Sequence, residues 1–102
     1  MTEKFIEVAT KDKILDGYGR VFDVNGTKVA VFNINGNFYA INNTCPHMGG
    51  SLGEGNLSES IVTCPLHAWK FDVKTGLCPV ADNIKVASYK VKTDGEKILV
   101  SL

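Results

Sequence analysis

RVFDVNGTKVAVFNINGNFYAI, residues 20–41, is the stretch that decides the fold class. It contains two Asn-Gly pairs, Asn25-Gly26 and Asn35-Gly36, and each pair is flanked by runs rich in Val, Phe and Ile. Asn-Gly accepts the two positive φ angles of a two-residue type I′ hairpin turn, and β-branched and aromatic residues favour strands. The stretch therefore predicts one hairpin between Arg20–Val24 and Thr27–Asn33, and a second hairpin between Val29–Ile34 and Phe38–Ile41.

The sequence on both sides of this stretch continues the β pattern. Residues 5–8 predict a short strand, while residues 10–19 fit either a loop or one helical turn. Further strands are predicted at 86–91 and 98–102, on either side of an Asp94-Gly95 turn. Because no segment shows sustained helical periodicity, the predicted fold is all-β, a small antiparallel sandwich or barrel.

The length and charge of the chain limit the kinds of protein it can be. A chain of 102 residues predicts a single domain. The 11 Lys and Arg side chains balance the 11 Asp and Glu side chains, which excludes the broad basic surface that binds nucleic acid. A domain of this size has a thin hydrophobic core, so a bound metal centre would help to stabilise it.

Cysteine usage and the N-terminal sequence predict a cytoplasmic protein. No apolar run approaches the ~18 residues that a membrane-spanning helix needs, and no apolar signal core follows the charges near the N-terminus. The three cysteines are an odd number, and cytoplasmic thiols stay reduced, so a disulfide framework is not expected. Metal ligation is the better expectation for these thiols.

Two short motifs combine one cysteine with one histidine each. They are CPHMGG at residues 45–50 and CPLHAWKFD at residues 64–72. A proline after each cysteine restricts the backbone, and Gly49-Gly50 allows the first loop to turn close to a bound ion. The motifs thus provide two chelating loops, whose candidate ligands are Cys45, His47, Cys64 and His67.

The mixed composition of each motif bears on the metal. Tetrahedral zinc accepts two Cys and two His, but zinc fingers typically pair Cys with Cys and His with His along the chain. In a [2Fe–2S] cluster, one iron can take both cysteines and the other both histidines, with each loop spanning the two irons. In that arrangement Cys45 and Cys64 hold the inner iron, and His47 and His67 hold the outer iron. Zinc remains the alternative.

The two motifs resemble the two cluster-binding boxes of Rieske proteins. This resemblance covers residues 42–79 closely and the rest of the chain more loosely. It implies one Rieske-type [2Fe–2S] cluster held by the four candidate ligands. It also implies a single Rieske domain, in which a cluster-binding subdomain at about 43–80 is inserted in a β base formed by residues 1–42 and 81–102.

Departures from the family pattern indicate the subtype. Cytochrome bc-type Rieske proteins have an additional cysteine in each box and join the two by a disulfide, whereas Gly50 and Leu66 occupy those positions here. Those proteins also have a serine and a tyrosine that donate hydrogen bonds to sulfur, where this chain has Trp69 and Phe71. Losing two O–H donors destabilises the reduced cluster, so the resemblance implies a reduction potential in the lower part of the Rieske range.

The subtype implies a function in electron transfer rather than catalysis. The chain resembles the ferredoxins of aromatic-ring oxygenase systems, which pass electrons from a flavin-dependent reductase to a terminal oxygenase. It also resembles the small subunit of cytoplasmic nitrite reductase, whose partner is the large sirohaem subunit. An oxygenase would need a further iron site with two histidines and a carboxylate, and both histidines are already used.

Few charges lie near the two motifs, which suits a surface for transient docking. The charged side chains within residues 45–80 are Glu54, Glu59, Lys70, Asp72 and Lys74. We expect the chain to be a monomer whose reductase and acceptor both dock on the tip that contains the two histidines. The residues expected to surround the cluster or contact a partner are Met48, Gly49, Leu66, Ala68, Trp69 and Pro79. Cys78 is expected to be a nearby thiol that is not a ligand.

Overall fold

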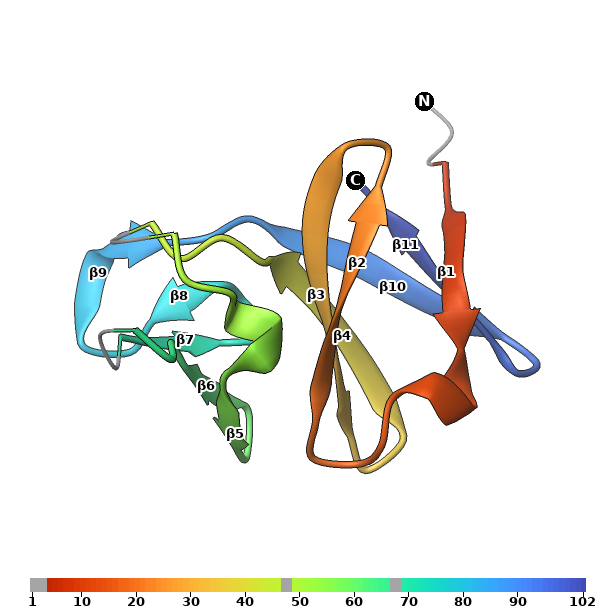
Figure 1. Cartoon of the computed structure of the whole chain (residues 1–102), viewed down its shortest axis with the longest axis horizontal. Helices are drawn as coiled ribbons and strands as arrows, with labels where there is room; N and C mark the ends of the chain where they lie inside the picture. Colours follow the sequence, from red (N-terminus) through yellow and green to blue (C-terminus); the bar gives the residue numbers. More distant parts are fainter. Residues whose placement is uncertain (1–3, 47–48, 67–68) are drawn as a thin grey trace.

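The computed structural model describes residues 4–46, 49–66 and 69–102, apart from the side chain of Asp82 (Figure 1). Its largest unit is a six-stranded sheet with the strand order β1-β11-β10-β4-β3-β2, in which all neighbours are antiparallel. The strands are β1 (Ile6–Thr10), β2 (Gly19–Val24), β3 (Thr27–Ile34), β4 (Asn37–Asn42), β10 (Ser88–Asp94) and β11 (Lys97–Ser101). The predicted all-β class is therefore confirmed.

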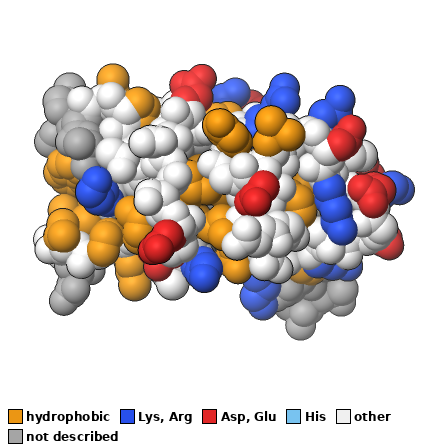
Figure 2. All heavy atoms as spheres, turned by 90° about the horizontal axis from the view of Figure 1, so that it is seen from below, with side chains coloured by type: hydrophobic (Ala, Val, Ile, Leu, Met, Phe, Trp, Pro, Cys, Tyr) orange, Lys and Arg blue, Asp and Glu red, His pale blue; other side chains and the backbone are white. Residues whose placement is uncertain are grey.

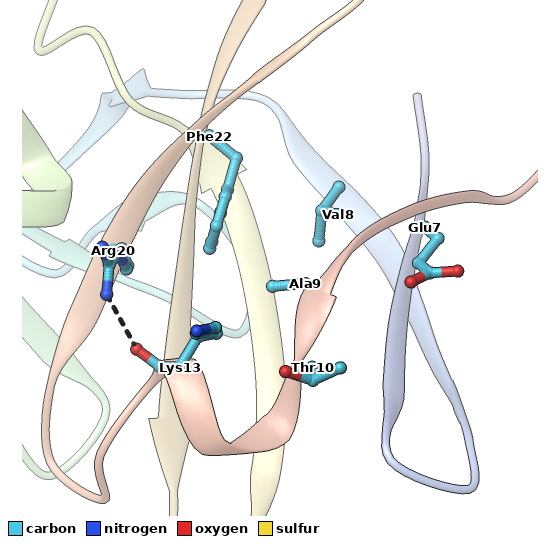
Figure 3. A pocket seen from close by; sticks show the side chains of 7 residues that line it. All are labelled: Glu7, Val8, Ala9, Thr10, Lys13, Arg20 and Phe22. Atoms are coloured by element: carbon cyan, nitrogen blue, oxygen red, sulfur yellow. Dashed lines mark hydrogen bonds between the residues drawn. The ribbon is translucent and has the colours of Figure 1, made fainter.

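The six-stranded sheet curls until its two edge strands face each other. Figure 3 shows β1 and β2 on either side of a cavity of about 440 Å³. Arg20 on β2 donates a hydrogen bond across its mouth to the Lys13 carbonyl oxygen, at 3.3 Å. The sheet thus forms a nearly closed barrel with one open seam.

Both predicted Asn-Gly turns are present. The φ angles are 50° at Asn25 and 87° at Gly26, and 54° at Asn35 and 86° at Gly36, which is the pattern of two type I′ turns. Residues 10–19 were predicted as either a loop or one helical turn. The structure has a single 3₁₀ turn there, η1 (Lys11–Lys13), followed by a loop.

The remaining strands form two small sheets, on the left of Figure 1, at the opposite end from β1 and β11. One is the three-stranded sheet β5 (Asn56–Ser58), β6 (Ile61–Thr63) and β7 (Lys70–Asp72), and the other pairs β8 (Leu77–Cys78) with β9 (Ala81–Lys85). A 3₁₀ turn, η2 (Leu52–Glu54), precedes β5.

The strand prediction near the C-terminus needs two corrections. Val86 lies between β9 and β10 rather than inside a strand, because its N–H donates to the Gly76 carbonyl oxygen at 2.8 Å and not to a neighbouring strand. The closing strand β11 ends at Ser101, so Leu102 follows it.

Two hydrophobic cores lie on opposite faces of β3. The first, which we call the site core, contains Ala30, Phe32, Ile41, Cys45, Leu52, Val62, Cys64, Phe71, Val73, Cys78 and Val86. The second, the barrel core, contains Ile14, Val24, Val29, Val31, Ala40, Ile98 and Val100. Because side chains alternate along a strand, β3 contributes Ala30 and Phe32 to one core and Val29 and Val31 to the other. This strand thus joins the barrel directly to the predicted ligand loops.

Candidate functional site

The first motif forms the tip of a short hairpin-like loop. At its base the Leu52 N–H donates to the Asn43 carbonyl oxygen at 2.9 Å, and Thr44 bridges to Ser51. Closer to the tip, the Cys45 N–H donates to the Gly50 carbonyl oxygen, and the Gly49 N–H donates to the Cys45 carbonyl oxygen, both at 2.9 Å. These bonds fix the backbone of Cys45, whose side chain is buried in the site core.

The second motif follows β6 and leads into β7. Thr63 pairs with Lys70 across this hairpin, and the Cys64 N–H donates to the Trp69 carbonyl oxygen at 2.7 Å. The motif therefore leaves the sheet at Cys64 and returns to it at Trp69. The Cys64 side chain is buried in the site core, as Cys45 is.

Gly50 brings the two motifs into contact. A Cβ atom at this position would lie 2.7 Å from Cys64 Sγ and 3.2 Å from Leu66 Cγ, closer than real Cβ atoms normally approach. The backbone of the first loop thus packs directly on the thiol of the second. Sequence reasoning assigned Gly49 and Gly50 together to loop turning, but only Gly49 has a positive φ, at 73°, and Gly50 is required for space.

The structure places part of the predicted site. It brings Cys45 and Cys64 into one core and sets Gly49, Leu66 and Trp69 on the adjoining loops. Four predicted residues lie outside the described residues: the candidate ligands His47 and His67, and the candidate contact residues Met48 and Ala68.

The described part of the site fits an iron–sulfur cluster. Thiolates are the ligands that such clusters require, and the two motifs supply two buried thiols from adjacent loops. Gly50 keeps the space beside Cys64 Sγ free of a side chain, as close approach of a cofactor requires. Cys78, the third cysteine, is also buried in this core.

Two exposed carboxylates of the barrel, Asp12 and Asp23, have lowered pKa values. The hydrogen bond from Lys28, at 3.1 Å, and a second from the Gly26 N–H lower the pKa of Asp23. A hydrogen bond from the Thr10 hydroxyl lowers the pKa of Asp12. Both carboxylates are exposed, so these shifts concern the barrel surface rather than the ligand loops.

Exposed apolar side chains gather beside the second motif. Figure 2 shows hydrophobic side chains concentrated at the end of the molecule where Figure 1 places β8 and β9, with more charged side chains towards the other end. Leu66 is 58% exposed and Val80 is 86% exposed. A groove of about 330 Å³ lies here, and its lining residues are Trp69, Lys70, Cys78, Val80, Ala81 and Ile84.

Sequence reasoning found only part of this apolar surface. Trp69 lines the groove, and Pro79 is exposed at the β8–β9 turn. Val80 and Ile84 were missed because they lie outside both motifs, and only the fold of β8 and β9 brings them next to Trp69. The position of Val80 directly after Pro79, in a turn, was the available signal.

Comparison with known proteins agrees with the geometry. The family described as "Rieske [2Fe-2S] domain" matches residues 4–93. The ferredoxin component of the naphthalene 1,2-dioxygenase system from Pseudomonas aeruginosa is 37% identical over 105 residues, an alignment covering 100% of this chain and 99% of the relative.

Two solved structures are also similar. The ferredoxin of carbazole 1,9a-dioxygenase from Nocardioides aromaticivorans has a TM-score of 0.88 and 38% identity, covering 95% of this chain and 96% of that chain. A putative NADH-dependent nitrite reductase small subunit from Mycobacterium tuberculosis has a TM-score of 0.92 over 100% of this chain and 97% of that chain. Its identity is 21%, so that likeness shows the fold alone. The chain therefore belongs to the Rieske [2Fe–2S] domain family, as a ferredoxin that binds one Rieske cluster and carries electrons.

Proposed function

We propose that this ferredoxin receives electrons from a flavin-dependent reductase and delivers them one at a time to the terminal oxygenase of an aromatic-ring dioxygenase system. The observation that supports this most strongly is the similarity to a dioxygenase ferredoxin over 100% of the chain. We also propose a cytoplasmic location, because three cysteines are an odd number and a disulfide framework is not expected.

The proposed ligands are Cys45 and Cys64 for one iron and His47 and His67 for the other. When bound, the cluster supplies a centre that accepts and releases one electron without breaking a substrate bond. The two thiolates bring the charge of an oxidised [2Fe–2S] core to zero, and neutral imidazoles add none. Burial of Cys45 and Cys64 in the site core keeps water away from the thiolates.

The surroundings of the site support a potential in the lower part of the Rieske range, which spans roughly −150 to +300 mV. Phe71 is fully buried in the same core as both cysteines and has no hydroxyl group that could donate to sulfur. A hydrogen-bond donor at this position would stabilise the more negative reduced state.

We further propose that residues of about 43–80 form a cluster-binding subdomain inserted in a β base of residues 1–42 and 81–102. The separate sheets of β5–β7 and β8–β9 support this division. Because β9 pairs with β8, we propose moving the C-terminal boundary of this subdomain from about residue 80 to Lys85, so that β9 belongs to the subdomain and not to the β base.

The function is tested by reconstituting electron flow with purified components. A flavin-dependent reductase, NADH, this chain and an aromatic-ring dioxygenase should form product only when the chain is present. The competing role is the small subunit of a nitrite reductase. Association with a large sirohaem subunit, together with no electron transfer to an oxygenase, would establish that role instead.

The exposed apolar surface near Leu66 and Trp69 is the proposed docking face. Leu66→Glu should slow oxidation of the reduced ferredoxin by the oxygenase at least about tenfold, because an unpaired carboxylate buried at an interface costs several kcal/mol. The matched control is Leu15→Glu, since Leu15 is 69% exposed but lies beside η1 on the barrel. Stopped-flow rates measure both variants, and equal rates with unchanged cluster absorption would contradict this docking face.

A further inference from the structure

We infer that Asn43 is a positioning residue that holds the first ligand loop in register with the second. Asn43 follows β4 and is only 7% exposed, although its side chain is polar. Buried amides are costly unless their hydrogen bonds are satisfied, so the contacts of this side chain indicate its role. The inference rests on the proposed assignment of Cys45 and Cys64 as ligands.

The side chain of Asn43 bonds to the far end of the first ligand loop. Its Oδ1 accepts a hydrogen bond from the Gly53 N–H at 2.7 Å and another from the Ser51 hydroxyl at 3.2 Å. Its Nδ2 lies 3.0 Å from Ser51 Oγ and donates to it. One amide therefore joins the residue that enters the loop to the residues that leave it.

The backbone of Asn43 attaches the same point to the barrel. Its N–H donates to the Lys28 carbonyl oxygen on β3 at 2.9 Å, and its own carbonyl oxygen accepts from Leu52. Gly53 is enclosed between Asn43 and β2, because a Cβ atom there would lie 2.6 Å from Val21 Cγ2 and 3.1 Å from Asn43 Oδ1. The base of the loop is thus packed against two strands, and these contacts leave little room for the base to move.

Backbone contacts along the loop connect its base to the site. The Thr44–Ser51 bridge and the hydrogen bond from Cys45 to Gly50 continue from Asn43 towards the tip. Gly50 then packs on Cys64 Sγ without space for one more carbon atom. A shift of the base of the first loop therefore changes the position of the Cys45 backbone relative to the Cys64 thiol.

Removing the side-chain amide of Asn43 should speed loss of the cluster, and not only lower the stability of the fold. In Asn43→Ala the buried Gly53 N–H loses its acceptor, which favours movement of the loop. Groups that orient metal ligands without binding the metal typically change metal affinity by roughly 10–100-fold when they are removed. We expect cluster loss from Asn43→Ala to be about tenfold faster than from the wild type.

The chain offers a matched control in Asn33. This asparagine is 8% exposed, donates to the Ile14 carbonyl oxygen at 2.8 Å and accepts from the Gly36 N–H at 2.9 Å. Its bonds hold the loop after η1 and a turn of the barrel, so Asn33→Ala removes a similar number of buried hydrogen bonds away from the ligand loops. Asn43→Asp is the conservative variant, because it keeps the oxygen that accepts from Gly53.

The experiment follows decay of the visible cluster absorption in the holoprotein at a temperature below the unfolding transition of every variant, with electron paramagnetic resonance spectra of the reduced state. Asn43→Ala should lose the cluster about tenfold faster. Asn33→Ala should match the wild type, and Asn43→Asp should be slower than Asn43→Ala. If Asn43→Ala does not fold, Ser51→Ala should still lose the cluster faster than Asn33→Ala.

Equal cluster loss from Asn43→Ala and Asn33→Ala would overturn the inference, because the effect would then follow the stability of the fold. So would loss from Asn43→Ala at the wild-type rate. Failure of the ligand assignment has a different signature, since variants in which Cys45 or Cys64 is replaced would then keep the metal centre.

Discussion

Cys64→Ser is expected to abolish cluster binding, whereas Cys78→Ser should retain a full cluster. All three cysteines are buried in the site core, so burial does not distinguish cysteines that bind the cluster from those that do not. The distinction comes from the motifs, because Cys45 and Cys64 each begin a loop with a histidine and Cys78 does not. Serine replaces a soft thiolate by a hydroxyl, which iron–sulfur clusters bind poorly. Cys45→Ser should behave as Cys64→Ser does.

The measurement is the iron and sulfide content of each variant after anaerobic purification, together with its visible absorption. Cys78→Ser is the matched control, since it makes the same chemical change in the same core. A full cluster in Cys64→Ser, or cluster loss confined to Cys78→Ser, would contradict the proposed ligand set.

Gly50→Ala is expected to prevent cluster binding while leaving the barrel folded. The added Cβ would lie 2.7 Å from Cys64 Sγ and 3.3 Å from Leu66 Cδ1. Relief of this contact must separate the two loops, since the Gly50 carbonyl oxygen is itself held by the Cys45 N–H. We expect less than about one tenth of the wild-type iron content, the scale of loss that displaced metal ligands produce.

The control for this variant is Gly36→Ala on the barrel. Gly36 has a φ of 86° and no neighbouring atom within 4 Å of an added Cβ, so alanine there strains the backbone without a steric clash. It should cost about 1–2 kcal/mol of unfolding free energy and keep the full cluster. Iron content and thermal unfolding followed by circular dichroism separate the two effects. A full iron content in Gly50→Ala would show that the loops tolerate separation.

The barrel could be predicted from local sequence because its turns are specified locally. Asn25 and Asn35 both adopt the positive φ that an Asn-Gly hairpin requires, and the flanking apolar runs are long enough to define strands. The small sheets were not predicted. Their strands are as short as Leu77–Cys78 and Asn56–Ser58, and such lengths carry no periodicity.

The candidate site was likewise predictable only in part. Cys45 and Cys64 were predicted as ligands because cysteine and histidine at short spacing have few other uses. Contacts between the loops could not be predicted, because they depend on tertiary packing. The space required at Gly50 appears only when the two loops lie side by side, and the hydrogen bonds of Asn43 appear only when the first loop closes on its own base.

We propose that the chain holds a one-electron [2Fe–2S] centre with two cysteine and two histidine ligands. The most direct test is electron paramagnetic resonance of the dithionite-reduced protein, with nitrogen couplings measured by pulsed methods. We expect a rhombic signal whose mean g lies well below the free-electron value, with couplings from two histidine nitrogens. An electron paramagnetic resonance-silent protein containing one zinc ion, or a cluster spectrum without nitrogen couplings, would contradict it.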